Sequence, residues 1–581
     1  MIHSRFLKLL IPFLIIGCNK SAPNPIKKSS LDYTSALTYT EVIDFYARAT
    51  KVNSAYKITI DSFGKSDSGH PIHLVKVSHQ TSTPSIKILL QNGIHPGEPD
   101  GIEASMLLVK SLIDGDYQLP QHIELNIIPV YNIGGMLQQN HYSRANQNGP
   151  EVYGFRGNAK NFDLNRDYLK ADTQNTKAFY ELFHQLEPHF FIDTHVSNGA
   201  DYQYTGTHLF THHNKLNPLL GQFLKNVFIP DFERNLSQQN ISVTPYVNVF
   251  NQPIDESGFT AFFDHPRYST GFVSLWEVPG MMIETHMLKE YNSRVETTLA
   301  MIKSLLKICE AHAEQLKAVK NKALHQQKNS SHYPIAYAID KTKADSLNFL
   351  GYEHEYITSR VTGAPRLKFY NGRPKTIRLP YYNYYKATDS VIIPKAYLIP
   401  QAWKNIIDLM QLNNIEFSQL NKDSSLLVEV YRFKDITTSN TSYEGHFRHR
   451  DFEINISNEE ITFSKGDYII PTAQQGLAYL LESLEPKATD SFFRWNFFDT
   501  YLQQKEHFSP YVFEDLAEGI LKENPDLNEL FQAKKAQDSA FNNHPHLQLD
   551  WIYKNSNYYE AVHLRYPIFR IPKEPNTSSL F

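Results

Sequence analysis

A short apolar segment that leads into two potential metal ligands constrains the fold of this chain most strongly. Residues 86–90 are mostly apolar and predict a buried strand bounded by polar and turn residues. His95 and Glu98 follow three residues apart, and helical spacing then covers 101–112. Open α/β sheets bind ligands at this kind of loop, where a strand ends and a helix begins. His95 and Glu98 could therefore share a zinc ion, although many such pairs are ordinary surface loop residues.

Two later segments repeat this arrangement. The run 189–195 predicts a strand that ends in His195, and the run 281–286 predicts another with Glu284 near its end. Because the carboxyl ends of parallel strands meet at one edge of a sheet, we expect these side chains to lie together. The other elements that we predict here are helices at 40–50, 173–186 and 288–312, a hairpin over 58–77 and a strand at 123–130.

These strand ends offer the ligands of a catalytic zinc site. His95, Glu98 and His195 would form a His₂Glu set that leaves a position for water. Bound zinc lowers the pKa of its water and polarises a carbonyl oxygen. A separate carboxylate must take the proton of that water and return it to the leaving amine, and Glu284 fits this role.

A long polar loop that follows Asn132-Ile-Gly-Gly135 and extends to Asp167 could supply the cations that the reaction needs. Loops of this length within a compact domain are more often functional than idle. Arg156 or Arg144 could stabilise a tetrahedral oxyanion. Arg166, beside Asn165, offers a bidentate clamp for a substrate carboxylate.

The N-terminus predicts a targeting segment. Arg5 and Lys8 precede a short apolar stretch, 9–16, that is too short to span a bilayer and leads to Cys18. The ending Leu-Ile-Ile-Gly-Cys resembles the lipobox of bacterial lipoproteins, in which the cysteine is lipidated; a plain secretory signal or an uncleaved anchor is the alternative. The only other cysteine is Cys309, so lipidation would exclude an intramolecular disulfide. We predict a signal peptide at 1–17, a tether at 18–35 and a lipid-anchored protein of a bacterial cell envelope, facing the periplasm or the exterior.

The chain of 581 residues exceeds what one core usually holds. We predict a catalytic domain at 36–314, a polar linker at 315–331 and a β-rich α+β companion domain at 332–581. The net charge of −4, without a run of Lys and Arg, gives no electrostatic footprint for nucleic acid. The companion domain could pack on the first and shape its cleft, or bind carbohydrate through aromatic residues that look exposed, namely Tyr381, Tyr382, Tyr384 and Tyr385. We interpret three closely spaced histidines as loop residues: His208, His212 and His213.

Residues 35–310 resemble the zinc carboxypeptidase family through several motifs in order. They are Gly64-Lys-Ser-x-x-Gly, His95-x-x-Glu98, Asp163-Leu-Asn-Arg166, the strand-end His195 and Ile283-Glu284-Thr-His. The resemblance implies an α/β fold with a mixed, largely parallel sheet flanked by helices, and removal of C-terminal residues from peptides. It also implies one zinc ion on His95, Glu98 and His195, with Glu284 as general base. By the same resemblance Asn165 and Arg166 hold the terminal carboxylate, and Arg156, which we prefer to Arg144, stabilises the transition state.

The chain departs from the family pattern at three points. Gly97 stands where some digestive members have an arginine, which removes one carboxylate contact. The tyrosine that caps the substrate has no clear counterpart, and Tyr268 is our candidate. The C-terminal region is far larger than the small β-sandwich that follows some catalytic domains, and it resembles a region found in certain envelope-associated bacterial members.

Three functional hypotheses follow from the sequence. The leading one is a lipid-anchored zinc metallocarboxypeptidase in which zinc-bound water attacks the substrate. A second keeps the site but changes the substrate to a cell-wall peptide or another amide with a free carboxylate. A third, from another class, is a surface binding lipoprotein with a decayed enzyme domain. Side-chain specificity is not readable, because we expect the pocket for the last residue in loops within 240–275.

Overall fold

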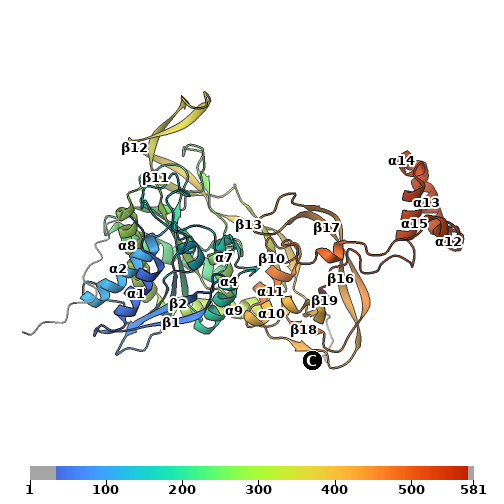
Figure 1. The fold of residues 1–581 in the computed structure, drawn as a ribbon, viewed down its shortest axis with the longest axis horizontal. Coiled ribbons are helices and arrows are strands. Elements are labelled where there is room, and N and C mark those ends of the chain that lie inside the picture. The colour runs from blue at the N-terminus through green and yellow to red at the C-terminus, as the bar shows by residue number, and fades with distance from the viewer. Residues whose placement is uncertain (1–34, 574–581) are drawn as a thin grey trace, which may run out of the picture.

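The computed structural model describes residues 35–573, and their N-terminal part is built on an eight-stranded mixed sheet (Figure 1). In spatial order its strands are β1 (Tyr56–Lys65), β2 (Pro71–His79), β4 (Ile123–Ile128), β3 (Ile86–Gln91), β5 (Phe190–Ser197), β9 (Gly280–His286), β6 (Gly206–Phe210) and β7 (Val243–Pro245). The central strands β4, β3, β5 and β9 run parallel, whereas β2 and β6 join them in antiparallel pairs. The predicted mixed, largely parallel sheet is confirmed.

Helices cover both faces of this sheet (Figure 1). On one face lie α1 (Tyr39–Ala49), α2 (Asp100–Asp114) and α8 (Tyr291–Ala311); on the other lie α4 (Gln174–Leu186), α7 (Ser269–Val273) and α9 (Ala313–Lys328). Local sequence explains where they begin, since Thr38 and Glu41 form a capping box on α1 and Thr173 caps α4. The shorter elements are α3 (Ile133–Met136), η1 (Leu164–Arg166), α5 (Pro218–Phe223), η2 (Leu224–Phe228), α6 (Ile229–Ser237), β8 (Phe259–Thr260) and η3 (Ser274–Trp276).

The parallel strands end together, as the sequence predicts. In the register of the sheet, Gln91 of β3 lies beside Asp193 of β5, and His195 of β5 lies beside Glu284 of β9. The loop that carries His95 and Glu98 leaves β3 at this edge and enters α2. The residues that we expected to meet therefore share one edge of the sheet.

The C-terminal part is β-rich, with a six-stranded sheet in the order β15-β18-β14-β19-β16-β17. Its strands are β10 (His332–Ile339), β11 (Asp345–Thr358), β12 (Pro365–Tyr382), β13 (Tyr385–Ile392), β14 (Ala396–Ile399), β15 (Ser418–Gln419), β16 (Ser424–Thr438), β17 (His449–Phe463), β18 (Tyr468–Pro471) and β19 (Phe569–Ile571). Its helices are η4 (Gln401–Trp403), α10 (Lys404–Leu412), α11 (Leu477–Leu484), η5 (Asp499–Leu502), α12 (Pro510–Glu523), α13 (Pro525–Gln537), α14 (Ser539–Asn542) and α15 (Pro545–Lys554). The β11–β12 hairpin and the α12–α15 group project from the body (Figure 1).

One hydrophobic core joins the two parts. Trp276 stacks on Tyr479 of α11 with ring centroids 5.5 Å apart, and a single buried cluster contains residues of both parts. The segment 315–331, predicted as a polar linker, lies largely in helix α9 instead. Ala313, Leu316 and Ala323 are buried on one stripe of that helix, which the polar composition of the segment concealed. The domain boundaries themselves stay predictions.

Several aromatic residues are less exposed than their sequence context suggests. The four tyrosines between 381 and 385 are half-buried. Tyr381 and Tyr382 pair with β8 through β12, and the Tyr381 ring lies 5.3 Å from that of Phe259. The rings of Tyr384 and Tyr385 contact those of His213 and His212. The prediction that His208 is a loop residue is wrong, because His208 lies in β6 and its Nε2 is 2.8 Å from Glu233 Oε1. His212 and His213 follow that strand as a stacked pair.

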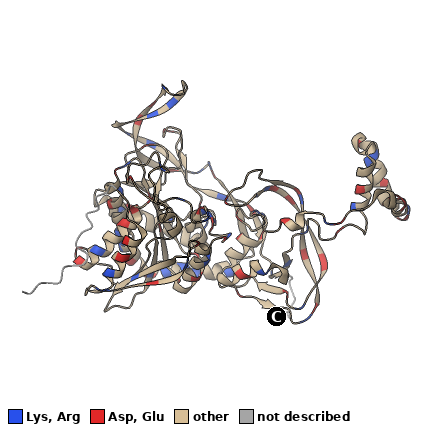
Figure 2. Ribbon diagram, viewed as in Figure 1, with Lys and Arg blue, Asp and Glu red and all other residues tan. Residues whose placement is uncertain are grey.

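Lys and Arg are interspersed with Asp and Glu along the ribbon in both parts of the molecule (Figure 2). Between residues 35 and 573, no helix is both long and apolar enough to cross a bilayer. Cys309 is buried in α8 as a free thiol. The predicted signal peptide, the lipidation site Cys18 and nearly all of the tether lie outside the described residues.

Candidate active site

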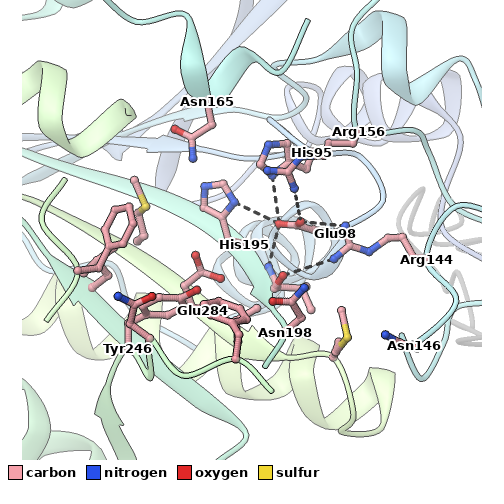
Figure 3. A pocket seen from close by; sticks show the side chains of 18 of the residues that line it. His95, Glu98, Arg144, Asn146, Arg156, Asn165, His195, Asn198, Tyr246 and Glu284 are labelled. Atoms are coloured by element: carbon pink, nitrogen blue, oxygen red, sulfur yellow. Dashed lines mark hydrogen bonds and ion pairs between the residues drawn. The ribbon is translucent and has the colours of Figure 1, made fainter. Parts of the chain in front are cut away.

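Three side chains that come from distant parts of the sequence converge at the sheet edge. His95, Glu98 and His195 each offer a ligand atom, and these atoms lie within 4.8 Å of one another (Figure 3). All three side chains are almost fully buried. In the part of the chain that the structure describes, this is the one group of His, Cys, Asp and Glu that could hold a metal ion. The predicted ligand set is thus brought together in space.

Two aspartates fix which nitrogen each histidine presents to the metal. His95 donates from Nε2 to Asp163 Oδ1 at 2.8 Å, and His195 donates from Nε2 to Asp193 Oδ2 at 3.0 Å. Each imidazole therefore turns Nδ1 toward Glu98. The buried Nδ1 of His95 makes no hydrogen bond, which fits an atom that would bind a metal. Carboxylates that orient metal-binding histidines in this way raise ligand basicity.

The charges of the metal-free site favour a cation. Burial alone would raise the pKa of the Glu98 carboxyl, but the Arg144 guanidinium and His95 outweigh it and hold that pKa well below its usual range. Burial would lower the pKa of His195, but the neighbouring Asp193 carboxylate raises it well above its usual value. His195 Nδ1 lies 3.1 Å from Glu98 Oε2, between the groups that could bind a metal ion. Residues and charge both fit a bound zinc ion.

Glu284 lies beside this cluster on the adjacent strand. It is the register partner of His195, and its carboxylate points into the same cavity (Figure 3). Burial raises the pKa of Glu284 to about 7, against the attraction of His195. A carboxyl group with a pKa near neutrality can both accept and return a proton.

The two candidate arginines occupy different places. Arg144 Nη1 donates to Glu98 Oε1 at 3.0 Å, and Arg156 Nε donates to Asp163 Oδ2 at 3.0 Å. Arg156 is the more exposed of the two side chains, at 44% against 13% for Arg144. A Cβ on Gly97 would lie 2.8 Å from Arg144 Cδ, so the arginine fills the space that a side chain at position 97 would need.

The predicted carboxylate clamp also lies on the wall of the cleft. Asn165 Oδ1 accepts from the Ser269 amide at 3.1 Å, which leaves its NH₂ group for a ligand. The Arg166 guanidinium lies 4.7 Å above the Tyr268 ring. Asn165, Arg166 and Tyr268 therefore line the same cleft as the metal cluster and Glu284.

The cleft has a volume of about 640 Å³. The apolar and aromatic side chains that line it include three from the predicted 240–275 segment and two from the sheet: Tyr246, Phe250, Phe262, Leu209 and Met282. Sequence reasoning did not select Tyr246, nor the orienting roles of Asp163 and Asp193. Asp193 lies two residues before the predicted ligand His195, and Asp163 opens the motif that contains Asn165 and Arg166. These positions were the available signal.

Comparison with known proteins agrees with this geometry. Residues 46–198 match the family model described as zinc carboxypeptidase, and this segment contains all three ligands of the cluster. The chain carries a zinc carboxypeptidase domain. It is therefore an enzyme of the metallopeptidase class. Glu284 lies beyond the matched segment, on strand β9, which pairs with β5 in the same sheet.

Two curated relatives align with most of the chain. Carboxypeptidase 2 of Trichophyton rubrum and of Trichophyton equinum are each 22% identical to it, over 81% of this chain and 86% of theirs. An alignment of that extent includes part of the C-terminal region as well as the carboxypeptidase domain. A solved metallo-carboxypeptidase from Burkholderia cenocepacia is 15% identical, covers 48% of this chain and 70% of its own, and has a TM-score of 0.36.

Proposed function

We propose that this protein is a zinc-dependent carboxypeptidase that removes C-terminal residues from peptides. The observation that carries the proposal is the placement of a carboxylate clamp, Asn165 and Arg166, on the cleft wall that also holds the three metal ligands. A metal site alone would suit many hydrolases. The clamp adds a reason to select a chain end, because a guanidinium and an amide can hold a free carboxylate by several hydrogen bonds.

Each side chain of the site has a defined task in this reaction. His95, Glu98 and His195 would hold zinc, which supplies a Lewis acid for the scissile carbonyl and lowers the pKa of water. Glu284 takes the proton of the attacking water on its carboxylate and passes it to the leaving amine nitrogen. Arg156 donates hydrogen bonds toward the carbonyl oxygen as negative charge develops there.

The orienting aspartates limit the freedom of this arrangement. Asp193 accepts from both His195 Nε2 and Ser269 Oγ, at 3.0 and 2.6 Å. Ser269 in turn donates its amide to Asn165. A metal ligand and a member of the carboxylate clamp are therefore held through one serine, which fixes the distance between the scissile bond and the chain end.

The test is a mass-spectrometric assay of a mixed peptide pool incubated with the zinc-loaded protein lacking residues 1–30. We expect loss of single C-terminal residues with the parent protein and no loss with Glu284→Gln, while peptides with amidated ends stay intact. The masses lost also report side-chain preference. Intact peptides with both proteins would refute the proposal and direct the search to cell-wall fragments.

We also propose a lipid anchor at Cys18 and a place on a bacterial envelope. The support is the sequence of residues 1–18, with its basic start, short apolar core and lipobox-like ending. A Cys18→Ser variant should move from the membrane fraction to the soluble fraction and lose incorporation of labelled fatty acid. Unchanged fractionation of that variant would refute the anchor.

A further inference from the structure

A tight turn of the C-terminal part reaches the carboxylate clamp. The turn Tyr443–His446 joins β16 to β17 and is closed by hydrogen bonds between the backbones of its first and last residues, at 2.8 and 3.1 Å. Gly445 has φ +81° there, and a Cβ at this position would lie 3.1 Å from a ring carbon of Phe162. The turn is therefore seated directly on the segment that contains the clamp.

Two side chains of this turn bond that segment. Tyr443 Oη accepts a hydrogen bond from Arg166 Nε at 2.9 Å. Glu444 Oε2 accepts from the backbone amide of Asp163 at 2.8 Å. Asp163 is the carboxylate that orients His95, so the C-terminal part contacts both the clamp and the support of a metal ligand.

Buried aromatic and charged groups hold the turn itself in place. The Tyr443 ring stacks on Trp495, with centroids 6.0 Å apart and planes inclined by 14°. Trp495 is fully buried. His446 Nε2 bonds Asp172 at 2.8 Å, six residues beyond Arg166. The phenol that contacts Arg166 is thus held by its ring, and the turn is held by His446.

We infer that Tyr443 is a positioning residue for the substrate carboxylate, acting through Arg166. The inference rests on the proposed carboxypeptidase function. Arg166 Nε is occupied by Tyr443, Nη1 donates to the Asn165 carbonyl at 2.9 Å, and the face of the guanidinium lies on Tyr268. These three contacts fix the plane of the guanidinium and leave its Nη2 edge for a ligand.

Removal of the phenol hydroxyl should loosen this arrangement. A long arginine side chain that is no longer held must be ordered when substrate binds, and its Nε becomes free to turn from its position. The clamp holds the carboxylate both before and during the reaction, so its loss weakens binding of the substrate and transition state alike. We expect the KM of Tyr443→Phe to rise by roughly tenfold while kcat stays within about twofold.

The experiment compares the parent, Tyr443→Phe and the control Tyr511→Phe as zinc-loaded full chains. Tyr443→Phe keeps the ring that stacks on Trp495 and removes only the hydroxyl. Tyr511 is 83% exposed on α12 and lies in the same C-terminal part. Steady-state kinetics on a peptide with a free C-terminal carboxylate should show the rise in KM for Tyr443→Phe alone, with equal zinc content in all three proteins.

A binding measurement separates this inference from the proposed function. In a Glu284→Gln background, calorimetry with the same peptide and its C-terminal amide should show that Tyr443→Phe weakens the acid and leaves the amide unchanged. In an Arg166→Ala background, the second substitution should have no further effect. An unchanged KM, or equal weakening of acid and amide, would overturn the inference even where the parent protein is an active carboxypeptidase. Absence of cleavage by the parent would instead refute the proposed function, and failure to prefer the acid over the amide would overturn both.

Discussion

The orientation of His195 by Asp193 provides a sharp test of the metal site. Asp193 accepts hydrogen bonds on both carboxylate oxygens: Oδ2 from His195 and Ser269, and Oδ1 from the Thr194 amide at 3.0 Å. The substitution Asp193→Asn is nearly isosteric but leaves one accepting atom in place of two. If the new NH₂ group faced Thr194, two donors would meet; if it faced His195, the imidazole would have to present the opposite tautomer, with a proton on Nδ1.

Either orientation of the Asp193→Asn amide should weaken zinc binding. Replacement of a partner that orients a metal-binding histidine typically costs about 10- to 100-fold in metal affinity, or about 1.4 to 2.8 kcal/mol. Competition with a chromophoric chelator measures this affinity directly. We expect the zinc dissociation constant of Asp193→Asn to be about 10- to 100-fold higher than that of the parent.

A second Asp–His pair supplies the matched control. Asp231 Oδ2 bonds His312 Nε2 at 2.8 Å, and both side chains are partly exposed and take no part in the metal cluster. Asp231→Asn should leave zinc affinity unchanged. The reasoning fails if Asp193→Asn binds zinc as tightly as the parent, or if Asp231→Asn loses as much affinity.

Three further perturbations have expected outcomes. Activity should fall as the pH is lowered from about 8 to about 5, because only ionised Glu284 accepts a proton and burial raises its pKa to about 7. A bound cation shifts this loss of activity to lower pH. A rate that rose on acidification would contradict the assignment. Arg294 Nε pairs with Asp100 Oδ2 at 2.9 Å, so Arg294→Met leaves the Asp100 carboxylate as a buried, unpaired charge and should lower the free energy of unfolding by about 3–5 kcal/mol. An unchanged midpoint of urea unfolding would contradict this. Burial raises the pKa of Glu277 to about 7, so the folded state binds this proton more tightly than the unfolded state. The free energy of unfolding should therefore fall as the pH rises from about 4.5 to about 7, and Glu277→Gln should remove up to about 3 kcal/mol of that fall. An equal pH dependence of stability in both proteins would refute this.

The catalytic part of the fold was predictable because its signals are local. The strand at 86–90 and the helix at 101–112 appear as β3 and α2 with bounds shifted by one or two residues. The strand lies within the parallel sheet and is marked by a short, nearly continuous apolar run between polar and turn residues, whereas the helix is marked by apolar residues at helical spacing. The order of the parallel strands then places His95 and His195 at one edge.

The remaining features depend on contacts that no local pattern reports. The helix at 313–328 buries only a few apolar side chains within a polar segment, so composition indicated a linker. Tyr443 and Arg166 are 277 positions apart, and their hydrogen bond exists because two separately predicted parts share one core. Gly97 had indicated a lost contact, whereas the structure shows its space taken by Arg144 from a distant loop.

The central claim is that this chain is a carboxypeptidase whose activity requires one zinc ion at His95, Glu98 and His195. The most direct measurement is a titration of metal-free protein with zinc, in which release of the C-terminal residue from a peptide is followed at each addition. The account predicts that activity is absent without metal, rises linearly and stops rising at one equivalent per chain. Full activity in the metal-free protein, or no activity after one equivalent has bound, would contradict it.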